Sequence, residues 1–352
     1  MSAMKPGIGR LSVVAFASLI ALSGLQVRSE VANEYLAGKQ ISLFIGTTAG
    51  GGYDLYARTL ARHIARHIPG HPSIIAKNMP GAGGLTLANY LYNRAASDGS
   101  ELATVQNGLP FEKLFQTLSA DGKNALFDAT KFGWIGSIMQ TVFVTVTWHA
   151  SGVKTLQEAT MKEVVLGASA TSSDSYILAM LSNNLLGTKF KVVHGYAGAA
   201  EVDLAVENGE VQGKAGKDWS TLTSTRPQWI SDKKINILLQ MGLKTRPDLK
   251  GVPTAIGLAR TPDDRQIMEI VFAKFGMSRP FLAPPGIAPQ RLEMLRRAFD
   301  ATMNDSAFRA EAERLGMEVD PVTGENVQAL VSRIMATSAD LARRAREILK
   351  PR

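Results

Sequence analysis

Residues 41–68 read ISLFIGTTAGGGYDLYARTLARHIARHI, in which a short apolar run, a glycine-rich turn and an amphipathic segment follow one another. The apolar run at 41–45 ends at Gly46 and is typical of a strand buried in a parallel sheet. After the turn, apolar side chains recur every fourth residue, at Tyr56, Leu60, Ile64 and Ile68. That spacing predicts a helix over 53–68, and a strand that leads directly into a helix is the building unit of α/β proteins.

The same unit recurs along the chain. Short apolar runs predict further strands at 73–76, 102–105, 142–148, 164–166, 190–193 and 235–240. Helices are predicted at 85–95, 176–186, 199–207, 289–302 and 326–349. Because the pattern restarts once, we expect two α/β lobes, each a mostly parallel sheet flanked by helices. We expect residues 30–146 and 281–352 to form lobe 1, and residues 147–280 to form lobe 2, inserted into it.

Residues 1–29 have the pattern of an export signal. Lys5 and Arg10 form a basic start, residues 11–25 carry no charge, and Val27-Arg28-Ser29 offers small residues at the positions that a signal peptidase reads. The uncharged stretch is shorter than the about 20 residues needed to span a bilayer. A buried first helix or a membrane anchor is the alternative, and we expect a cleaved signal peptide.

Composition excludes several kinds of site. The chain has no cysteine, so disulfides, cysteine-ligated metal centres and a thiol nucleophile are excluded. Its formal net charge is +8, and removal of the signal would lower that charge by three. This mild positive charge favours small anions, but no basic stripe is interleaved with aromatic residues, so we expect no nucleic-acid partner.

The turn at 46–54 is the first candidate binding loop. Its three successive glycines let the backbone approach a ligand closely and turn free N–H groups toward an anion at the start of a helix. The ligand-binding candidates here are Thr47, Thr48, Gly51, Gly52, Tyr53 and Asp54. A flexible connection with Asp54 as a helix cap is the alternative. A phosphate loop is disfavoured, because it needs Gly-Lys-Ser/Thr where this chain has Gly51-Gly52-Tyr53.

The turn at 167–175 is the second candidate loop, and it is rich in hydroxyl groups. Hydroxyl and backbone N–H groups can bind a carboxylate without a countercharge. The candidates here are Ser169, Ala170, Thr171, Ser172, Ser173, Asp174 and Ser175. Capping of the following helix by one serine or threonine is the alternative, but it leaves the other hydroxyl groups unassigned.

Other features give weaker signals. Tyr196, in a third turn at 194–199, is a candidate to cover a ligand, with ordinary turn chemistry as the alternative. His63 and His67 have metal-compatible spacing, but neighbouring arginines disfavour a cation, so we expect a solvated helix face and no metal. Residues 167–171 lack the last glycine of a nucleophile elbow, and no catalytic residue or cofactor is predicted.

Several stretches resemble the TctC/Bug family of periplasmic solute receptors, the substrate-binding components of tripartite tricarboxylate transporters. The matching segments are 49–54, 78–84, 195–198, 209–213, 279–286 and 321–324. They lie in the family's order and span essentially the whole chain after the signal. One departure is Gln212, where an aspartate is common in the family.

The resemblance implies a two-lobed clamshell, the type II-like Venus flytrap of periplasmic binding proteins, with a carboxylate ligand between the lobes. It implies that the loops at 47–54 and 169–175 grip one carboxylate, largely through backbone groups and ordered water. Asn107 and Tyr196 would then face the variable end of the ligand.

We therefore expect a periplasmic, monomeric solute receptor for a di- or tricarboxylate or an aromatic acid, with no turnover and no cofactor. The resemblance implies that it delivers the acid to a membrane permease of a tripartite tricarboxylate-type transporter. A periplasmic sensor that presents the acid to a signalling receptor is the alternative. An enzyme acting on carboxylated substrates is the third hypothesis.

Overall fold

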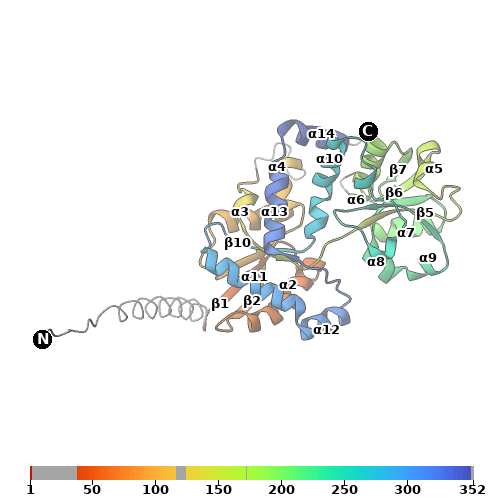
Figure 1. Ribbon diagram of the computed structural model, residues 1–352. Coiled ribbons are helices and arrows are strands. Elements are labelled where there is room, and N and C mark those ends of the chain that lie inside the picture. Colours follow the sequence, from red (N-terminus) through yellow and green to blue (C-terminus); the bar gives the residue numbers. More distant parts are fainter. Residues whose placement is uncertain (2–37, 116–123, 172, 350–352) are drawn as a thin grey trace.

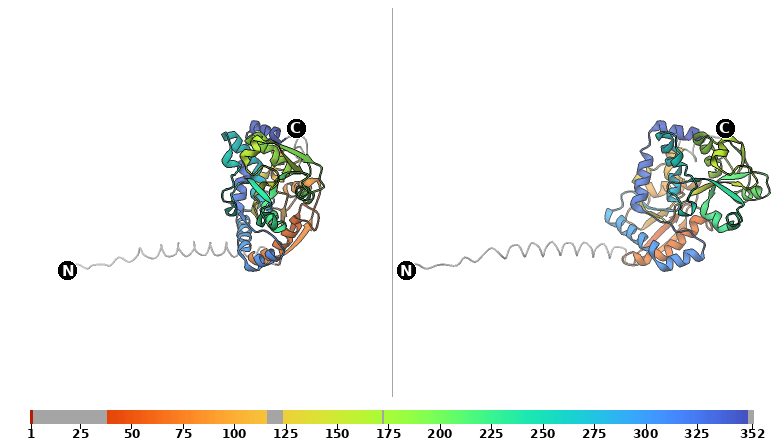
Figure 2. Two further views of the ribbon diagram at one scale, coloured as in Figure 1. Left: turned by 90° about the vertical axis from the view of Figure 1, so that its right-hand side faces the viewer. Right: turned by 45° about the vertical axis from the view of Figure 1, so that its right-hand side comes forward.

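The computed structural model of the chain describes residue 1 and residues 38–349, apart from 116–123 and 172. Two separate β-sheets, each flanked by helices, form two lobes that lie side by side (Figures 1 and 2). The predicted two-lobed α/β fold is confirmed. Apart from residue 1, the expected signal at 1–29 lies outside the described residues. No helix in the described part of the chain combines the length and apolar character that a membrane crossing requires.

The sheet of lobe 1 has the strand order β11-β4-β10-β3-β1-β2. Its strands are β1 (Gln40–Ile45), β2 (Ser73–Asn78), β3 (Glu101–Thr104), β4 (Gly133–Ser137), β10 (Pro280–Ala283) and β11 (Val322–Thr323). The helices of this part of the chain are α2 (Gly52–Ile64), α3 (Leu85–Asn93), α4 (Glu112–Phe115), α11 (Pro289–Asn304), α12 (Ser306–Arg314), α13 (Gly324–Met335) and α14 (Ala339–Leu349). β1 pairs in parallel with both β2 and β3, as its buried apolar run predicts.

The sheet of lobe 2 has the strand order β7-β6-β8-β5-β9. Its strands are β5 (Phe143–Trp148), β6 (Val164–Ala168), β7 (Phe190–His194), β8 (Gly213–Asp218) and β9 (Ile235–Met241). The helices between them are α5 (Leu156–Met161), α6 (Asp174–Leu181), α7 (Ala199–Glu207), α8 (Trp219–Thr225) and α9 (Pro227–Ser231), and α10 (Pro262–Phe272) follows the last strand.

Both sheets are mixed rather than purely parallel. β10 runs antiparallel to its neighbours in lobe 1, and β5 runs antiparallel to its neighbours in lobe 2. Each of these strands directly follows a crossing from the other lobe. The chain therefore enters each sheet at the end where the parallel strands have their carboxyl termini. The first strand after the crossing consequently runs antiparallel to them.

The chain crosses between the sheets through residues 138–142 and returns through 278–279. β5 pairs within the second sheet over its whole length, so the outward crossing comes before the boundary expected at residue 146. The apolar run at 142–148 indicates a strand, but it does not indicate which sheet the strand joins. α10, just before the return crossing, packs against α14 from the C-terminal part of the chain (Figure 1).

The helix α2 is anchored on lobe 1 by apolar and polar contacts. Its apolar side chains at fourfold spacing are buried with residues of β1, α11 and α12. His63 and His67 do not form the expected solvated face, because acids near α12 meet them. The Nε2 atom of His63 lies 2.5 Å from Oε2 of Glu311, and that of His67 lies 2.9 Å from Oδ2 of Asp305. The apolar contacts and the two histidine–acid contacts together hold α2 in place on lobe 1, and they set the position of its N-terminal turn.

Candidate functional site

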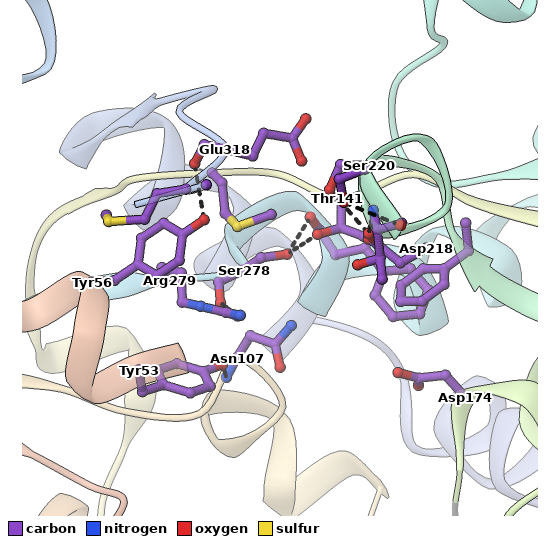
Figure 3. Close-up of a pocket in the computed structure, with 17 residues that line it drawn as sticks. Tyr53, Tyr56, Asn107, Thr141, Asp174, Asp218, Ser220, Ser278, Arg279 and Glu318 are labelled. Carbon is purple, nitrogen blue, oxygen red and sulfur yellow. Dashed lines mark hydrogen bonds between the residues drawn. The ribbon is translucent and has the colours of Figure 1, made fainter. Parts of the chain in front are cut away.

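A cavity of about 590 Å³ opens between the two lobes (Figure 3). Its lining comes from the first turns of α2, the loop after β3, the loop before β11, the N-termini of α6 and α8, and both crossing segments. Most of these positions follow the carboxyl ends of parallel strands, which is where open α/β sheets bind ligands. The cavity therefore combines groups from both lobes with the segments about which the lobes could move.

Two tyrosines from α2 form the wall on the lobe 1 side. The phenol oxygen of Tyr53 accepts a hydrogen bond from the backbone N–H of Asn107 at 2.9 Å. The hydroxyl of Tyr56 donates to the backbone carbonyl of Glu318 at 3.2 Å. Burial raises the pKa of both phenols above the usual value of tyrosine, so both are neutral at pH 7. These bonds fix both rings against the cavity.

Arg279 lies between the two tyrosine rings (Figure 3). Its guanidinium carbon is 4.5 Å from the ring centroid of Tyr53 and 5.1 Å from that of Tyr56, within the range of cation–π attraction. Its Nη1 donates to the carbonyl of Ser278 at 2.7 Å, whereas its buried Nε has no hydrogen-bond partner. Among the described residues, no carboxylate forms an ion pair with Arg279.

The wall on the lobe 2 side is rich in hydroxyl groups. Ser220, Thr221 and Ser224 of α8 line it together with Asp218, the last residue of β8. Asp218 caps α8, since its Oδ1 accepts from the backbone N–H of Thr221 at 2.6 Å and from the hydroxyl of Ser220 at 3.0 Å. This wall offers hydrogen-bonding groups and no basic side chain.

Two further acids of the lining are paired with bases. Oδ1 of Asp174 accepts from Nζ of Lys274 at 2.5 Å, and Oε1 of Glu318 accepts from Nη1 of Arg246 at 2.9 Å. Neither carboxylate therefore neutralises Arg279. The cavity presents an unpaired guanidinium on one side and acids that are engaged elsewhere.

Of the predicted site residues, Tyr53, Asn107 and Asp174 come together in this cavity. The other candidates of the first loop are not among the lining residues: Thr47, Thr48, Gly51, Gly52 and Asp54. The positive backbone φ that favours glycine occurs at Gly50 (+86°) and not at Gly51, where φ is −85°. A contact of these residues with a ligand stays a prediction.

Asp54 braces this loop from within. It is 5% exposed, and its carboxylate accepts hydrogen bonds from the N–H of Gly50, Nε of Arg58 and Nδ2 of Asn78, each at 2.9 Å. Burial acts to raise the pKa of Asp54, but the bonds from Arg58, Gly50 and Asn78 outweigh it and lower the pKa to about 2. The carboxylate is thus a structural acceptor that shapes the turn before α2.

We expect Asp54→Asn to destabilise the protein by about 2 kcal/mol at pH 6, because a carboxylate with a lowered pKa stabilises the fold while it is ionised. That contribution is present above the unfolded pKa of about 4 and is lost as the pH falls toward 2. Thermal unfolding of both proteins between pH 2 and pH 6 measures the difference. It should shrink toward pH 2, whereas Asp232→Asn, at an exposed acid, should change little throughout. A difference independent of pH would contradict this role.

The second predicted loop is used partly as a helix cap. The hydroxyl of Ser173 donates to the carbonyl of Ala170 at 2.6 Å and accepts from the N–H of Tyr176 at the start of α6. Asp174 is the member of this loop that lines the cavity, and Ser172 lies outside the described residues. The remaining candidates do not line it: Ser169, Ala170, Thr171 and Ser175.

Tyr196 also lies away from the cavity. It packs against the hydrophobic cluster of lobe 2, and a Cβ atom built on Gly167 would lie 3.5 Å from its ring. In the described part of the chain, no three His, Asp or Glu side chains are grouped so that they could hold a metal ion.

The residues that sequence reasoning missed are Tyr56, Arg279 and the hydroxyl groups of α8. Tyr56 was assigned to the buried face of a helix, which is correct but incomplete, since it also faces the cavity. Arg279 is separated from the glycine loop by more than 200 residues of sequence. The available signal was its position just before the run 280–285, at the predicted return to lobe 1.

No family model matches this chain. It is 25% identical over 322 residues to a UPF0065 protein encoded in the gbd 5′ region of Cupriavidus necator, covering 88% of each chain. A TctC solute-binding protein from Polaromonas, solved without ligand, has a TM-score of 0.67 at 19% identity, covering 88% of this chain and 98% of its own. An R. palustris protein solved with adipate has a TM-score of 0.54 at 19% identity, covering 87% and 97%.

These similarities confirm the predicted resemblance at the level of fold. The chain has the two-lobed fold of TctC-type solute-binding proteins, to which the similar Polaromonas structure belongs.

Proposed function

We propose that this protein is a periplasmic solute receptor that captures a small organic carboxylate between its two lobes. The observation that carries this proposal is the cavity between the lobes, in which Arg279 has no protein carboxylate as a partner among the described residues. An anionic ligand would supply the missing charge, and the hydroxyl groups of α8 would bind its polar groups from the other side.

Two further observations support the proposal. The similar R. palustris structure was solved with adipate, a dicarboxylate. The proposed export signal at 1–29 would place the mature chain outside the cytoplasm, where it would hand the acid to a membrane permease of the tripartite tricarboxylate type. Of the residues predicted from sequence, Tyr53, Asn107 and Asp174 are the ones we propose to contact the ligand.

The test is a thermal-shift panel on the mature protein with adipate, citrate, benzoate, glucose, ethanolamine and ATP. A ligand that binds only the folded state at 100 times its dissociation constant adds about 2.7 kcal/mol of stability. Each kcal/mol moves the midpoint by roughly 2–4 °C for a domain of 150–250 residues, so we expect a rise of several degrees with at least one acid.

The stabilising acid should be recovered chemically unchanged after incubation with the protein. Stabilisation by glucose, ethanolamine or ATP alone would contradict the proposal, and steady conversion of the acid would show an enzyme instead.

A further inference from the structure

We infer that Arg279 is the group that holds the ligand's carboxylate, through the edge of a guanidinium stacked between Tyr53 and Tyr56. The inference rests on the proposed function and deepens it, because the sequence alone assigns the grip on the carboxylate to backbone and hydroxyl groups of two loops. It assigns this grip to the side chain of Arg279, which the acid approaches from the open side of the cavity.

The charge of Arg279 is not balanced by a protein carboxylate among the described residues. Arg279 is partly buried, and within the described residues it has no ion pair, although three acids line the same cavity. Asp174 and Glu318 are each bonded to another base, and Asp218 is bonded to the start of α8. A cation removed from water without a counterion is costly, and a bound carboxylate would offset that cost.

The two tyrosine rings hold the guanidinium between them. Figure 3 shows the guanidinium between the phenol rings of Tyr53 and Tyr56, with its nitrogen atoms toward the open part of the cavity. Both ring hydroxyls are hydrogen-bonded, so the rings are held in place. Because a ring lies on each side of the guanidinium, we expect an acceptor to approach along its free edge. A planar carboxylate can accept two parallel hydrogen bonds from such an edge. The ammonium group of a lysine at this position would not offer that planar pair of donors.

Only some of the N–H donors of the Arg279 guanidinium are used within the protein. Nη1 is bonded to the carbonyl of Ser278, and Nε is buried without a partner. The guanidinium also lies within hydrogen-bonding reach of the neutral Tyr53 phenol, and Nη2 is not one of the fully buried unpaired atoms. Nη2 is therefore the donor that we assign to the ligand's carboxylate.

The glycine-rich turn has a role in this arrangement. A Cβ atom at Gly52 would lie 3.3 Å from Nη2 of Arg279, which is tighter than an ordinary contact, whereas a Cβ at Gly51 would meet nothing within 4 Å. Because Gly52 has no side chain, the turn leaves room for Nη2 of Arg279. The group that approaches this glycine closely is therefore a side chain of the protein itself.

The same arrangement selects against polyphosphates. Among the described lining residues, Arg279 is the one basic side chain, and the others supply acids, hydroxyl and amide groups, and apolar side chains. A ligand with several negative charges in one cluster would leave most of them without a partner and near Asp174 or Asp218. The site therefore suits an organic acid with one carboxylate at Arg279 and its remaining polar groups toward α8.

The test compares affinities by calorimetry for the acid, among adipate, citrate and benzoate, that stabilises the wild type most. We expect Arg279→Gln to weaken binding by about 10- to 100-fold, since a hydrogen bond to a charged group contributes about 1.5–3 kcal/mol. Arg279→Lys should be intermediate, because it keeps the charge and loses the planar edge. Arg297→Gln removes an exposed arginine from α11 and should bind like the wild type.

Gly52→Ala is the second test, and it leaves the charge in place. Crowding of Nη2 should weaken binding, and circular dichroism should show that the variant is folded. Equal affinity of Arg279→Gln and wild type would overturn the anchor and leave the proposed function standing. If the wild type binds none of the three acids, both the anchor and the proposed function are wrong.

Discussion

Replacing Asp203 with alanine is expected to destabilise lobe 2 by about 3–5 kcal/mol, the usual cost of leaving buried charges without their partner. Asp203 of α7 lies between two lysines of β8, with Oδ1 3.2 Å from Nζ of Lys214 and Oδ2 in contact with Nζ of Lys217. The side chains of Lys214, Lys217 and Asp203 are 2%, 5% and 6% exposed, and burial lowers the pKa of Lys214. Without Asp203, two ammonium groups would face an apolar interior.

Thermal unfolding checks this expectation, with Asp232→Ala as the control at an exposed acid. At roughly 2–4 °C per kcal/mol, the midpoint of Asp203→Ala should fall by about 10 °C. Replacing all three charged groups with Leu and Met should recover much of the loss, because well-packed apolar side chains can substitute for a buried ion cluster. A loss below about 0.5 kcal/mol would show that the cluster is not needed.

Ligand binding is expected to bring the two lobes together. The cavity has one wall on α2 and another on α8, so an acid that touches both binds a closed arrangement better than an open one. The crossing segments at 138–142 and 278–279 lie side by side, with the hydroxyls of Thr141 and Ser278 2.8 Å apart. Paired short crossings of this kind allow hinge motion between lobes.

Distance measurements between two spin labels can detect this closure. The chain has no cysteine, so Glu313→Cys in α12 and Thr223→Cys in α8 would be unique labelling sites, and both positions are exposed near opposite sides of the cavity. The distance distribution should shift to shorter values with saturating acid and stay unchanged with glucose. An unchanged distribution with a saturating acid that calorimetry shows to be bound would contradict hinge closure.

Much of the fold could be predicted from local patterns. The strands at 40–45, 73–78 and 235–241 are close to their predicted bounds, because each contains a short apolar run bounded by turns. The predicted helix at 326–349 is instead two helices, α13 and α14, separated at 336–338. Two helices with similar apolar periodicity and a short break look like one helix in sequence.

The strand β8 could not be predicted, although it lies inside its sheet. It reads Gly-Lys-Ala-Gly-Lys-Asp over Gly213–Asp218, which resembles a polar turn. Its lysines are buried because Asp203 arrives from α7, and Gly213 is needed because a Cβ there would lie 2.2 Å from the carbonyl oxygen of Val146. Both causes depend on segments distant in sequence.

The site was predictable only where its residues follow strand ends. Tyr53 and Asp174 were found because each lies where a strand leads into a helix, and Asn107 was indicated by the family resemblance. Arg279 instead directly precedes a strand, and Tyr56 lies within a helix. The convergence of segments that are distant in sequence on one cavity leaves no trace in the spacing of any one of them.

The most direct test of the account is a crystal structure of the mature protein with the most stabilising acid. We expect the acid between the lobes, with a carboxylate oxygen within hydrogen-bond distance of Nη2 of Arg279 and polar contacts from α8 on the other side. An acid bound to one lobe only, or bound away from Arg279 with the cavity unoccupied, would contradict the account.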